Sequence, residues 1–450
     1  MRQLRLVNFR GDLFATGASF AGQTVLKLCS SIILTRILTP GDYGTITILM
    51  SVVFILVMLS DIGFSVCIVR SVRGEEQAYL NTAWTIRIVR AVINTALLYL
   101  LAPLIAALYH APSLTLPFRV LSVWFLIDGA QSTAFPVSVR RKNSRIVMYS
   151  ELTGTVWSTI FTVVYCYYSR DYWGMLYGAL VNRLIVVILS HRYYRDIRPS
   201  LQWDWPAARE IFEYTRFVMP SSMLTLVLNQ FDRAIFLRLF DFRLLGVYSL
   251  AGNIITPVEN LITKASQMVL YPRCAHNFRT DRTTFSLKYY LENIKVFIAI
   301  LGIPAAMGGA AHFLITALYD TRYAGAAAVL QAFAVRAVLK GLASPAEDML
   351  IATGESRLIL VANVYRVIWM VAAGLLGYRY LGFMGFTYGI ALSGLPGLLY
   401  YLWLQYRKDL LIVKFEIYKV AFAGGVGACA YAAAAVLLAL FPDVRIHFHL

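Results

Sequence analysis

The chain has 450 residues, of which 59% are hydrophobic and 14% charged, and its formal net charge is +17. Soluble proteins average roughly 45–50% apolar and about 25% charged residues, so this composition predicts a multi-span membrane protein. The basic excess is typical of cytoplasmic loops beside membrane spans, which favours that explanation over a nucleic-acid partner. The basic N-terminus precedes a span-length apolar stretch without a small-residue cleavage site, which predicts a first transmembrane helix rather than a signal peptide.

Apolar runs of about 20 residues are long enough to cross the hydrocarbon layer as helices. We expect thirteen such spans, the last of them unusually rich in Gly and Ala, at residues 13–38, 44–69, 83–108, 118–139, 148–168, 174–190, 217–239, 245–270, 291–318, 324–353, 358–378, 383–405 and 420–441. The predicted fold class is therefore an all-α integral membrane protein.

The loops between these runs alternate in basic charge. With the N-terminus in the cytoplasm, the cytoplasmic segments hold 23 Lys and Arg residues and the opposite segments hold 5. Because this bias sets the orientation of membrane proteins, we expect a cytoplasmic N-terminus and a C-terminus on the outer side.

Two segments of the chain resemble each other. Arg36 and Gly44 in "ILTRILTPGDYGTITIL" both recur 202 residues later in "IFLRLFDFRLLGVYSLA", where the arginine is Arg238. Six spans separate the copies, which predicts parallel repeats with a binding site between the halves near midplane. In the first copy we expect Pro40 and Gly41 to form the turn between spans and Gly44 to permit close helix packing.

These features divide the chain into four predicted parts. They are an N-terminal lobe of six helices, a cytoplasmic linker, a C-terminal lobe of six helices and an additional transmembrane helix, at residues 1–198, 199–216, 217–405 and 406–450. Trp203 and Trp205 in the linker, followed by a helical pattern, predict an interfacial helix whose indoles lie at headgroup level.

Motifs of several enzyme classes are missing from the sequence. It holds no GxxxxGK[ST] loop, no HExxH motif and no GxSxG elbow, and its predicted outer loops are about nine residues long at most. The five cysteines lack CxxC spacing, and His447 and His449 lie in a tail that we expect to be exposed. We therefore predict no catalytic residues, disulfide framework or metal site, and a transporter rather than a membrane-embedded enzyme such as a polymerase, which is the third hypothesis.

Many ionisable residues lie inside the predicted spans, where each costs about 2.5–3.5 kcal/mol unless it faces protein or water. Arg336 and Lys340 are four positions apart, so these two like charges share one helix face. Such a pair is explained by an anionic substrate entering a wet, net-positive cavity between the halves. The residues predicted to bind that substrate are Lys27, Arg87, Arg90, Arg183, Lys264, Arg336, Lys340 and Arg366.

Several of these charges have other interpretations. Buried ion pairs are the alternative for the central residues, and snorkelling to headgroups is the alternative near span ends. The acidic residues predicted either to couple transport to an ion or to pair with basic neighbours are Asp61, Asp128, Asp232 and Glu259. Arg36 and Arg238, near the outer ends of their spans, are predicted to lie at the outer mouth of the cavity.

Five stretches, in the same order, resemble the polysaccharide-transporter, or Wzx-like, branch of the multidrug/oligosaccharidyl-lipid/polysaccharide (MOP) flippase superfamily. They are "LTRILTPGDYG", "NQFDRAIFLRLFDFRLLGVYSLAGNI", "YDTRYAGAAAVLQAFA", "ATGESR" and "YLGFMGFTYGIAL". The resemblance covers about residues 8–405. The sequence departs from the family's pattern at Leu237, where a Gly is usual, and in the additional helix, whose "AGGVGACAYAAAA" suits close helix packing.

This resemblance implies two six-helix lobes around a central cavity and transport by alternating access. It implies that the substrate is an undecaprenyl-pyrophosphate-linked oligosaccharide repeat unit, moved from the cytoplasmic to the periplasmic leaflet of a bacterial inner membrane for surface or exopolysaccharide assembly. It further implies coupling to a proton or sodium gradient, and membrane lipids, a polysaccharide polymerase and a chain-length regulator as partners. The alternative hypothesis is a cation-coupled drug or metabolite antiporter of the MATE type, which would need a more acidic cavity.

Overall fold

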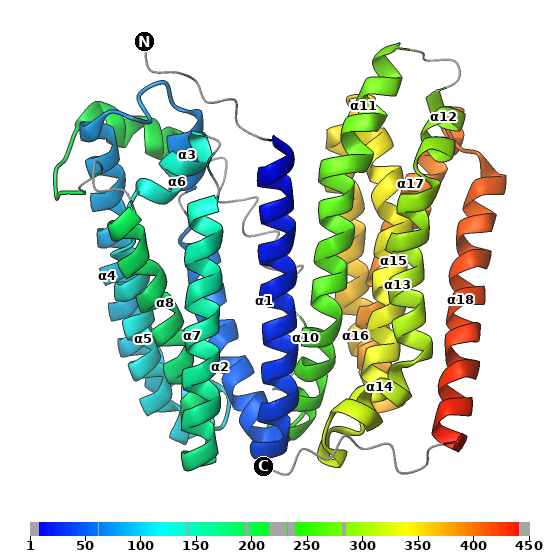
Figure 1. Cartoon of the computed structure of the whole chain (residues 1–450), viewed down its shortest axis with the longest axis horizontal. Helices are drawn as coiled ribbons and strands as arrows, with labels where there is room; N and C mark the ends of the chain where they lie inside the picture. Colours follow the sequence, from blue (N-terminus) through cyan, green and yellow to red (C-terminus); the bar gives the residue numbers. More distant parts are fainter. Residues whose placement is uncertain are drawn as a thin grey trace. The chain divides into compact units, whose positions relative to one another are not determined.

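A computed structural model of the chain describes residues 9–61, 63–141, 143, 145–193, 197, 199–215, 232, 239–280 and 285–440, with side chains from residue 19 onward except those of residues 356 and 357. Within these residues the chain forms helices and connecting segments, and no strand is present. Two compact units divide it, unit 1 at Met1–Leu245 and unit 2 at Gly246–Leu450. Figure 1 shows their helices.

Unit 1 is built from long helices with short connections. They are α1 (Phe9–Ile37), α2 (Pro40–Leu59), α3 (Phe64–Arg70), α4 (Gln77–Leu108), α5 (Thr115–Gly129), α6 (Ala134–Arg140), α7 (Arg145–Ser169) and α8 (Trp173–Tyr193). Within the unit, α7 packs against α1 and α8, α8 packs against α5, and α5 packs against α4. This succession of neighbours brings α4, α5 and α8 together, and all three carry residues predicted to be functional.

The connection between α1 and α2 differs from the prediction. Pro40 and Gly41 are already the first residues of α2, so the turn lies at Leu38 and Thr39. The Thr39 hydroxyl accepts the Asp42 N–H, and the Asp42 carboxylate accepts the Thr39 N–H at 2.9 Å. This reciprocal pair is a capping box, and Pro40 follows it because the fixed φ of proline suits the first helical position.

Unit 2 is arranged around α15. Its helices are α10 (Phe242–Ala265), which begins in unit 1 and continues through a π-helical turn at Ser266–Leu270, then α11 (Tyr271–Thr280), α12 (Phe285–Glu292), α13 (Ile294–Gly309), α14 (Ala311–Leu318), α15 (Ala326–Ala352), α16 (Ser356–Ala391), α17 (Leu395–Arg407) and α18 (Val413–Leu440). α15 packs against α13, α16 and α17, and α18 packs against α13. The predicted thirteenth span at 420–441 falls on α18.

Glycines allow two close backbone approaches in this fold. A Cβ on Gly44 would lie 1.9 Å from the carbonyl oxygen of Phe242, so the predicted close packing at Gly44 is confirmed. α16 reverses direction at Gly382, whose φ of 60° and ψ of −137° only glycine adopts readily. Its two arms then meet so closely that a Cβ on Gly377 would lie 2.2 Å from the Gly385 carbonyl oxygen.

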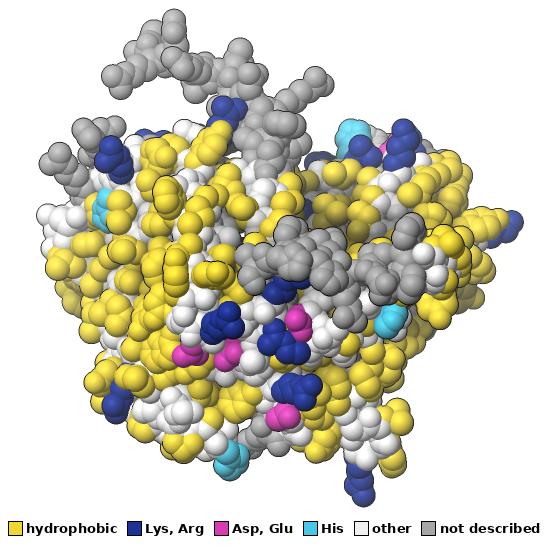
Figure 2. Space-filling model, turned by 60° about the horizontal axis from the view of Figure 1, so that its bottom comes forward, with side chains coloured by type: hydrophobic (Ala, Val, Ile, Leu, Met, Phe, Trp, Pro, Cys, Tyr) yellow, Lys and Arg dark blue, Asp and Glu magenta, His cyan; other side chains and the backbone are white. Residues whose placement is uncertain are grey.

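The predicted spans fall mainly on helices where the structure describes them, but those at 44–69, 118–139 and 291–318 are each interrupted between two helices. The span at 217–239 lies outside the described residues except for residues 232 and 239. By length and composition, six helices among the described residues could cross a membrane, or up to eight if two bent pairs each count as one span. The combined α16–α17 segment counts once although two spans were predicted there, and α1, α7 and α10 do not pass this test. The face shown in Figure 2 is largely hydrophobic, and a group of Lys, Arg, Asp and Glu side chains lies below its centre.

The segment predicted as a linker packs onto unit 1. Residues 205–215 are helical, and the Asn81 Nδ2 on α4 donates to the Gln202 Oε1 at 2.6 Å. Ala207, Ala208 and Ile211 of this segment, and Ile197 just before it, are buried in the core of unit 1. Trp203 and Trp205 are 43% and 73% exposed, as side chains at a headgroup interface would be.

The Gly- and Ala-rich helix α18 is attached to unit 2 in two ways. A Cβ on Gly309 of α13 would lie 2.2 Å from the Gly427 carbonyl oxygen, so the two backbones touch. Near the start of α18, Lys419 is 7% exposed and lies 2.6 Å from Glu416, which also accepts the Tyr290 hydroxyl at 2.7 Å. The small residues therefore hold α18 against α13, and the hydrogen bond from Tyr290 to Glu416 holds its first turn against α12.

Candidate functional site

Three helices of unit 1 bring basic side chains to a single carboxylate. Asp128 lies in the last turn of α5, where the Nη2 of Arg87 on α4 donates to its carbonyl oxygen at 2.7 Å and lies 3.3 Å from its Oδ2. Arg183 on α8 pairs with the Oδ1 of the same carboxylate. The exposed fractions of the three side chains are 5% for Arg87, 13% for Asp128 and 18% for Arg183. Asp128 is therefore the shared counter-ion of two largely buried arginines.

Further groups around this carboxylate were missed by the sequence analysis. The Gln131 Oε1 accepts hydrogen bonds from both Arg87 and Arg183. Glu151 on α7 lies 3.7 Å from Arg183, and the ring of Phe64 lies 4.8 Å below the Arg87 guanidinium. Gln131 had a signal in the sequence, because it is a polar residue inside a span-length apolar run; Glu151 lies at the end of its run, where a carboxylate is unremarkable.

Arg90 differs from the arginines beside it. It lies one turn from Arg87 on α4 and is half-buried, and Asp128 and Asp61 act on it only through their charges. Within the described part of the chain it has no hydrogen bond or ion pair. Of the predicted arginines in unit 1 with described side chains, Arg90 is the one whose donors remain available to a substrate.

Unit 2 repeats this arrangement around Glu259 of α10. The Nε of Arg336 lies 2.8 Å from the Glu259 carboxylate, and the Lys340 Nζ donates to the Glu259 carbonyl oxygen at 3.1 Å. Both basic residues come from α15, and the Arg336 guanidinium also lies 4.3 Å from the centre of the Phe333 ring. The two like charges predicted to share a helix face therefore meet the same acidic residue, and only Arg336 forms an ion pair with its carboxylate.

Arg366 on α16 is the third basic group near this cluster. Its Nε is buried and has no hydrogen-bond partner among the described residues, while the charges of Arg336, Glu259 and Glu347 act on it. Glu347 was not predicted. It follows Lys340 by seven positions on α15, so the sequence already placed it on the same helix face.

The other predicted residues lie elsewhere on their helices. Lys27 is exposed on α1, Lys264 is half-buried in the last turn of α10, and Arg36 is half-buried in the last turn of α1. Asp232 is half-buried, and Arg238 lies outside the described residues. Nothing in the structure tests the roles assigned to these residues, which stay predictions.

The two clusters have a common chemistry. Each contains a carboxylate neutralised by arginine and at least one further cation that forms no ion pair with a carboxylate in the described ranges: Arg90 in unit 1, and Lys340 and Arg366 in unit 2. Such cations suit an anionic ligand, since phosphate oxygens accept charge-assisted hydrogen bonds. No three His, Cys, Asp or Glu side chains among the described residues lie close enough to hold a metal ion.

Comparison with known sequences identifies the family of this chain and several relatives. The model of the family described as "Polysaccharide biosynthesis protein" matches residues 33–350. Lipopolysaccharide biosynthesis protein WzxC of Escherichia coli K12 is 21% identical over 82% of this chain and 74% of its own length. Teichuronic acid biosynthesis protein TuaB of Bacillus subtilis 168 is 21% identical over 66% of this chain and 62% of its own. Succinoglycan biosynthesis transport protein ExoT of Rhizobium meliloti 1021 is 22% identical over 73% and 65%.

Solved structures establish the fold. The inward closed conformation of the lipid II flippase MurJ has a TM-score of 0.70 at 12% identity, over 96% of this chain and 99% of MurJ. An inward-facing MATE transporter of the MOP superfamily has a TM-score of 0.65 at 15% identity, over 86% of this chain and 95% of its own. These matches confirm the predicted all-α, MOP-type membrane transporter fold; the details of the lobes and the role of the additional helix stay predictions.

Proposed function

Because the chain belongs to the polysaccharide biosynthesis protein family, we propose that it is a flippase that carries a lipid-linked oligosaccharide across the membrane. The observation that carries this proposal is the presence of Arg90, Lys340 and Arg366 within helices long and apolar enough to span a membrane. Relatives named for lipopolysaccharide, teichuronic acid and succinoglycan biosynthesis support a polysaccharide precursor as the substrate class. This is a transport function rather than an enzymatic one.

Physical chemistry explains why such a transporter would keep these cations. A lipid-linked sugar with a phosphate or pyrophosphate loses its hydration when it enters a low-dielectric path, and fixed basic groups replace those hydrogen bonds. The neutralised arginines Arg87, Arg183 and Arg336 would shape the walls of the path, while Arg90, Lys340 and Arg366 would meet the anion. A membrane potential that is negative inside favours outward movement of negative charge by about 2.3 kcal/mol per charge per 100 mV.

The finer parts of the proposal follow from the resemblance. The carrier is undecaprenyl pyrophosphate, the membrane is a bacterial inner membrane, and transport runs from the cytoplasmic to the periplasmic leaflet by alternating access. A proton or sodium gradient supplies the driving force. Because arginines already pair with Asp128 and Glu259, these two carboxylates are poor candidates for ion coupling. A polysaccharide polymerase and a chain-length regulator act with the protein.

The test is genetic complementation. In a strain that lacks the native gene, Arg90→Gln, Lys340→Gln and Arg366→Gln should each reduce surface polysaccharide roughly tenfold or more, since a hydrogen bond to a charged group contributes about 1.5–3 kcal/mol. Arg209→Gln is the matched control, because Arg209 is 82% exposed on the linker helix. Membrane abundance is measured in parallel. Normal export by all three variants at normal abundance would show that these residues do not contact the substrate.

The antiporter alternative is supported by fold alone, because the MATE structures are 15% identical or less. Efflux of cationic dyes separates the two functions. A chain that confers dye resistance in an efflux-deficient strain and does not restore polysaccharide export would overturn the flippase proposal.

A further inference from the structure

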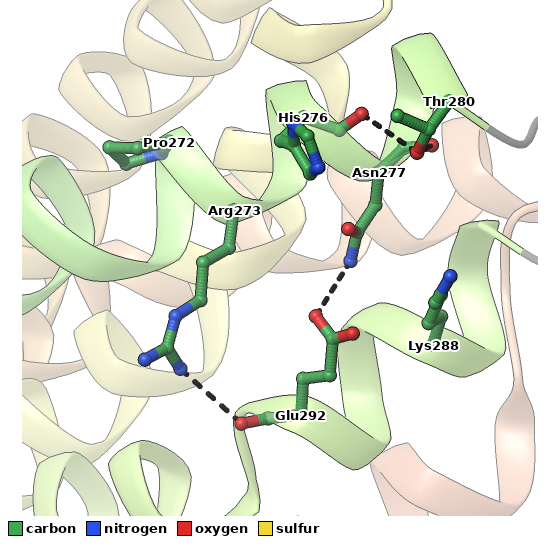
Figure 3. Close-up of a pocket in the computed structure, with 7 residues that line it drawn as sticks. All are labelled: Pro272, Arg273, His276, Asn277, Thr280, Lys288 and Glu292. Atoms are coloured by element: carbon green, nitrogen blue, oxygen red, sulfur yellow. Dashed lines mark hydrogen bonds between the residues drawn. The ribbon is translucent and has the colours of Figure 1, made fainter.

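A polar pocket at one end of unit 2 lies apart from the two charged clusters. Its volume is about 600 Å³, within the roughly 300–1,000 Å³ typical of small-molecule sites. Helix α11 contributes Pro272, Arg273, His276, Asn277 and Thr280, and helix α12 contributes Lys288 and Glu292 (Figure 3). We refer to these seven residues as the α11–α12 pocket.

The pocket is built on a rigid hydrogen-bonded frame. The Nη1 of Arg273 donates to the Asn293 Oδ1 at 3.0 Å and to the Glu292 carbonyl oxygen at 3.4 Å. Asn293 is fully buried at the 58° bend between α12 and α13, and its Nδ2 donates to the Tyr289 carbonyl oxygen at 2.8 Å. The guanidinium is therefore held in place by one nitrogen, while its other N–H groups stay available.

The charges of the pocket favour an anion. The Glu292 Oε2 accepts a hydrogen bond from Asn277 at 2.9 Å, which leaves two cations, Arg273 and Lys288, against one carboxylate that already has a partner. His276 and Lys288 extend from facing helices into the space between them (Figure 3). Their side chains form no hydrogen bond or ion pair within the part of the chain described here. Three basic side chains around one open space match the oxygens of a phosphate group.

The surroundings of the pocket indicate where that phosphate comes from. Leu287 and Leu291, beside Lys288 on α12, are 47% and 53% exposed, and the apolar helix α13 begins at Ile294. A lipid whose headgroup lies in the pocket would place its acyl chains along these exposed leucines. We propose that the α11–α12 pocket binds a phosphate ester anion, supplied by the headgroup of an anionic membrane lipid.

The test compares single charge removals in the full-length purified protein. Native mass spectrometry would measure binding of phosphatidylglycerol and of phosphatidylcholine, with inorganic phosphate as a soluble competitor. Lys288→Gln should weaken phosphatidylglycerol binding about fivefold, because each basic residue near a membrane surface contributes by about that factor. The double variant Lys288→Gln/His276→Gln should bind phosphatidylglycerol more weakly still. Lys295→Gln is the control, since Lys295 is an exposed lysine on α13 outside the pocket.

Each outcome has a clear meaning. Selective loss in Lys288→Gln with retention in Lys295→Gln supports the pocket, and inability of inorganic phosphate to compete identifies the lipid as the source. Competition by inorganic phosphate in the wild type but not in Lys288→Gln supports the same phosphate chemistry with a soluble ligand. Equal affinity of wild type and Lys288→Gln overturns the proposal, and so does equal weakening by both lysine variants, because that is general surface electrostatics. Unchanged unfolding midpoints of the variants in phosphatidylcholine exclude misfolding as the cause.

Discussion

Asp128→Asn offers the most direct test of the charged cluster in unit 1. The substitution keeps the shape of the side chain and removes the negative charge that Arg87 and Arg183 share. With the three side chains 5%, 13% and 18% exposed, breaking such a buried pair costs about 3–5 kcal/mol. We expect the free energy of unfolding, measured by tryptophan fluorescence in a detergent–denaturant titration, to fall by that amount.

Two further variants make this prediction specific. Glu151→Gln removes a carboxylate that is 38% exposed and 3.7 Å from Arg183, so it should cost no more than about 1 kcal/mol. Adding Arg183→Met to Asp128→Asn should recover about 1–3 kcal/mol, because the double variant no longer buries that uncompensated charge. The reasoning is refuted if Asp128→Asn unfolds at the same denaturant concentration as the wild type.

Two more predictions concern packing and pH. Gly309→Leu should detach α18 from α13 and lower both membrane abundance and the unfolding midpoint. Gly424→Leu should leave both quantities unchanged, because no atom lies within 4 Å of a Cβ at that position. Similar losses in both variants would contradict the packing argument. The hydrogen bond from Arg141 lowers the pKa of Glu75, so its stabilisation is fully present above the unfolded-state pKa and is lost as the pH falls through the folded-state pKa. Because both side chains are 44% exposed, Glu75→Gln should cost less than about 1 kcal/mol at neutral pH and nothing in strong acid; a cost that persists in strong acid would exclude this ion pair as its source.

The sequence predicted where the helices lie, but it did not predict the bends inside the predicted spans. The predicted span at 118–139 is one apolar run, but α5 and α6 meet there at 51°. The break is possible because α8 supplies hydrogen-bond partners: the Ser132 N–H donates to the Ser190 hydroxyl at 3.0 Å, and the His191 Nε2 lies 2.8 Å from the Ala130 carbonyl oxygen. These partners are 58 and 61 residues away in the sequence. The hydropathy of the run at 118–139 therefore does not predict the break.

The pairing of charges was hidden for a related reason. Arg87 and Arg90 are three positions apart, so helical spacing puts them on the same face of α4 and does not distinguish them. Contact with Asp128 depends on how α4 and α5 are rotated about their own axes, which is set by packing. That rotation buries Arg87 against Asp128 and leaves Arg90 without an ion pair among the described residues. Glu347 could have been found from its spacing after Lys340, because a carboxylate seven positions along a helix lies on the same face.

The shared counter-ion in unit 1 also has a consequence for how the protein is made. Arg87 precedes Asp128 by 41 residues, and Arg183 follows Asp128 by 55. At roughly 5–20 residues per second of synthesis, α4 is produced about 2–8 s before its acceptor, and α5 then waits about 3–11 s for α8. In the first interval Arg87 lacks its native counter-ion, and in the second Asp128 has Arg87 as a partner and still lacks Arg183. Correct insertion of unit 1 therefore depends on three helices staying close together until α8 is synthesised, because only Arg183 completes the set of charges around Asp128.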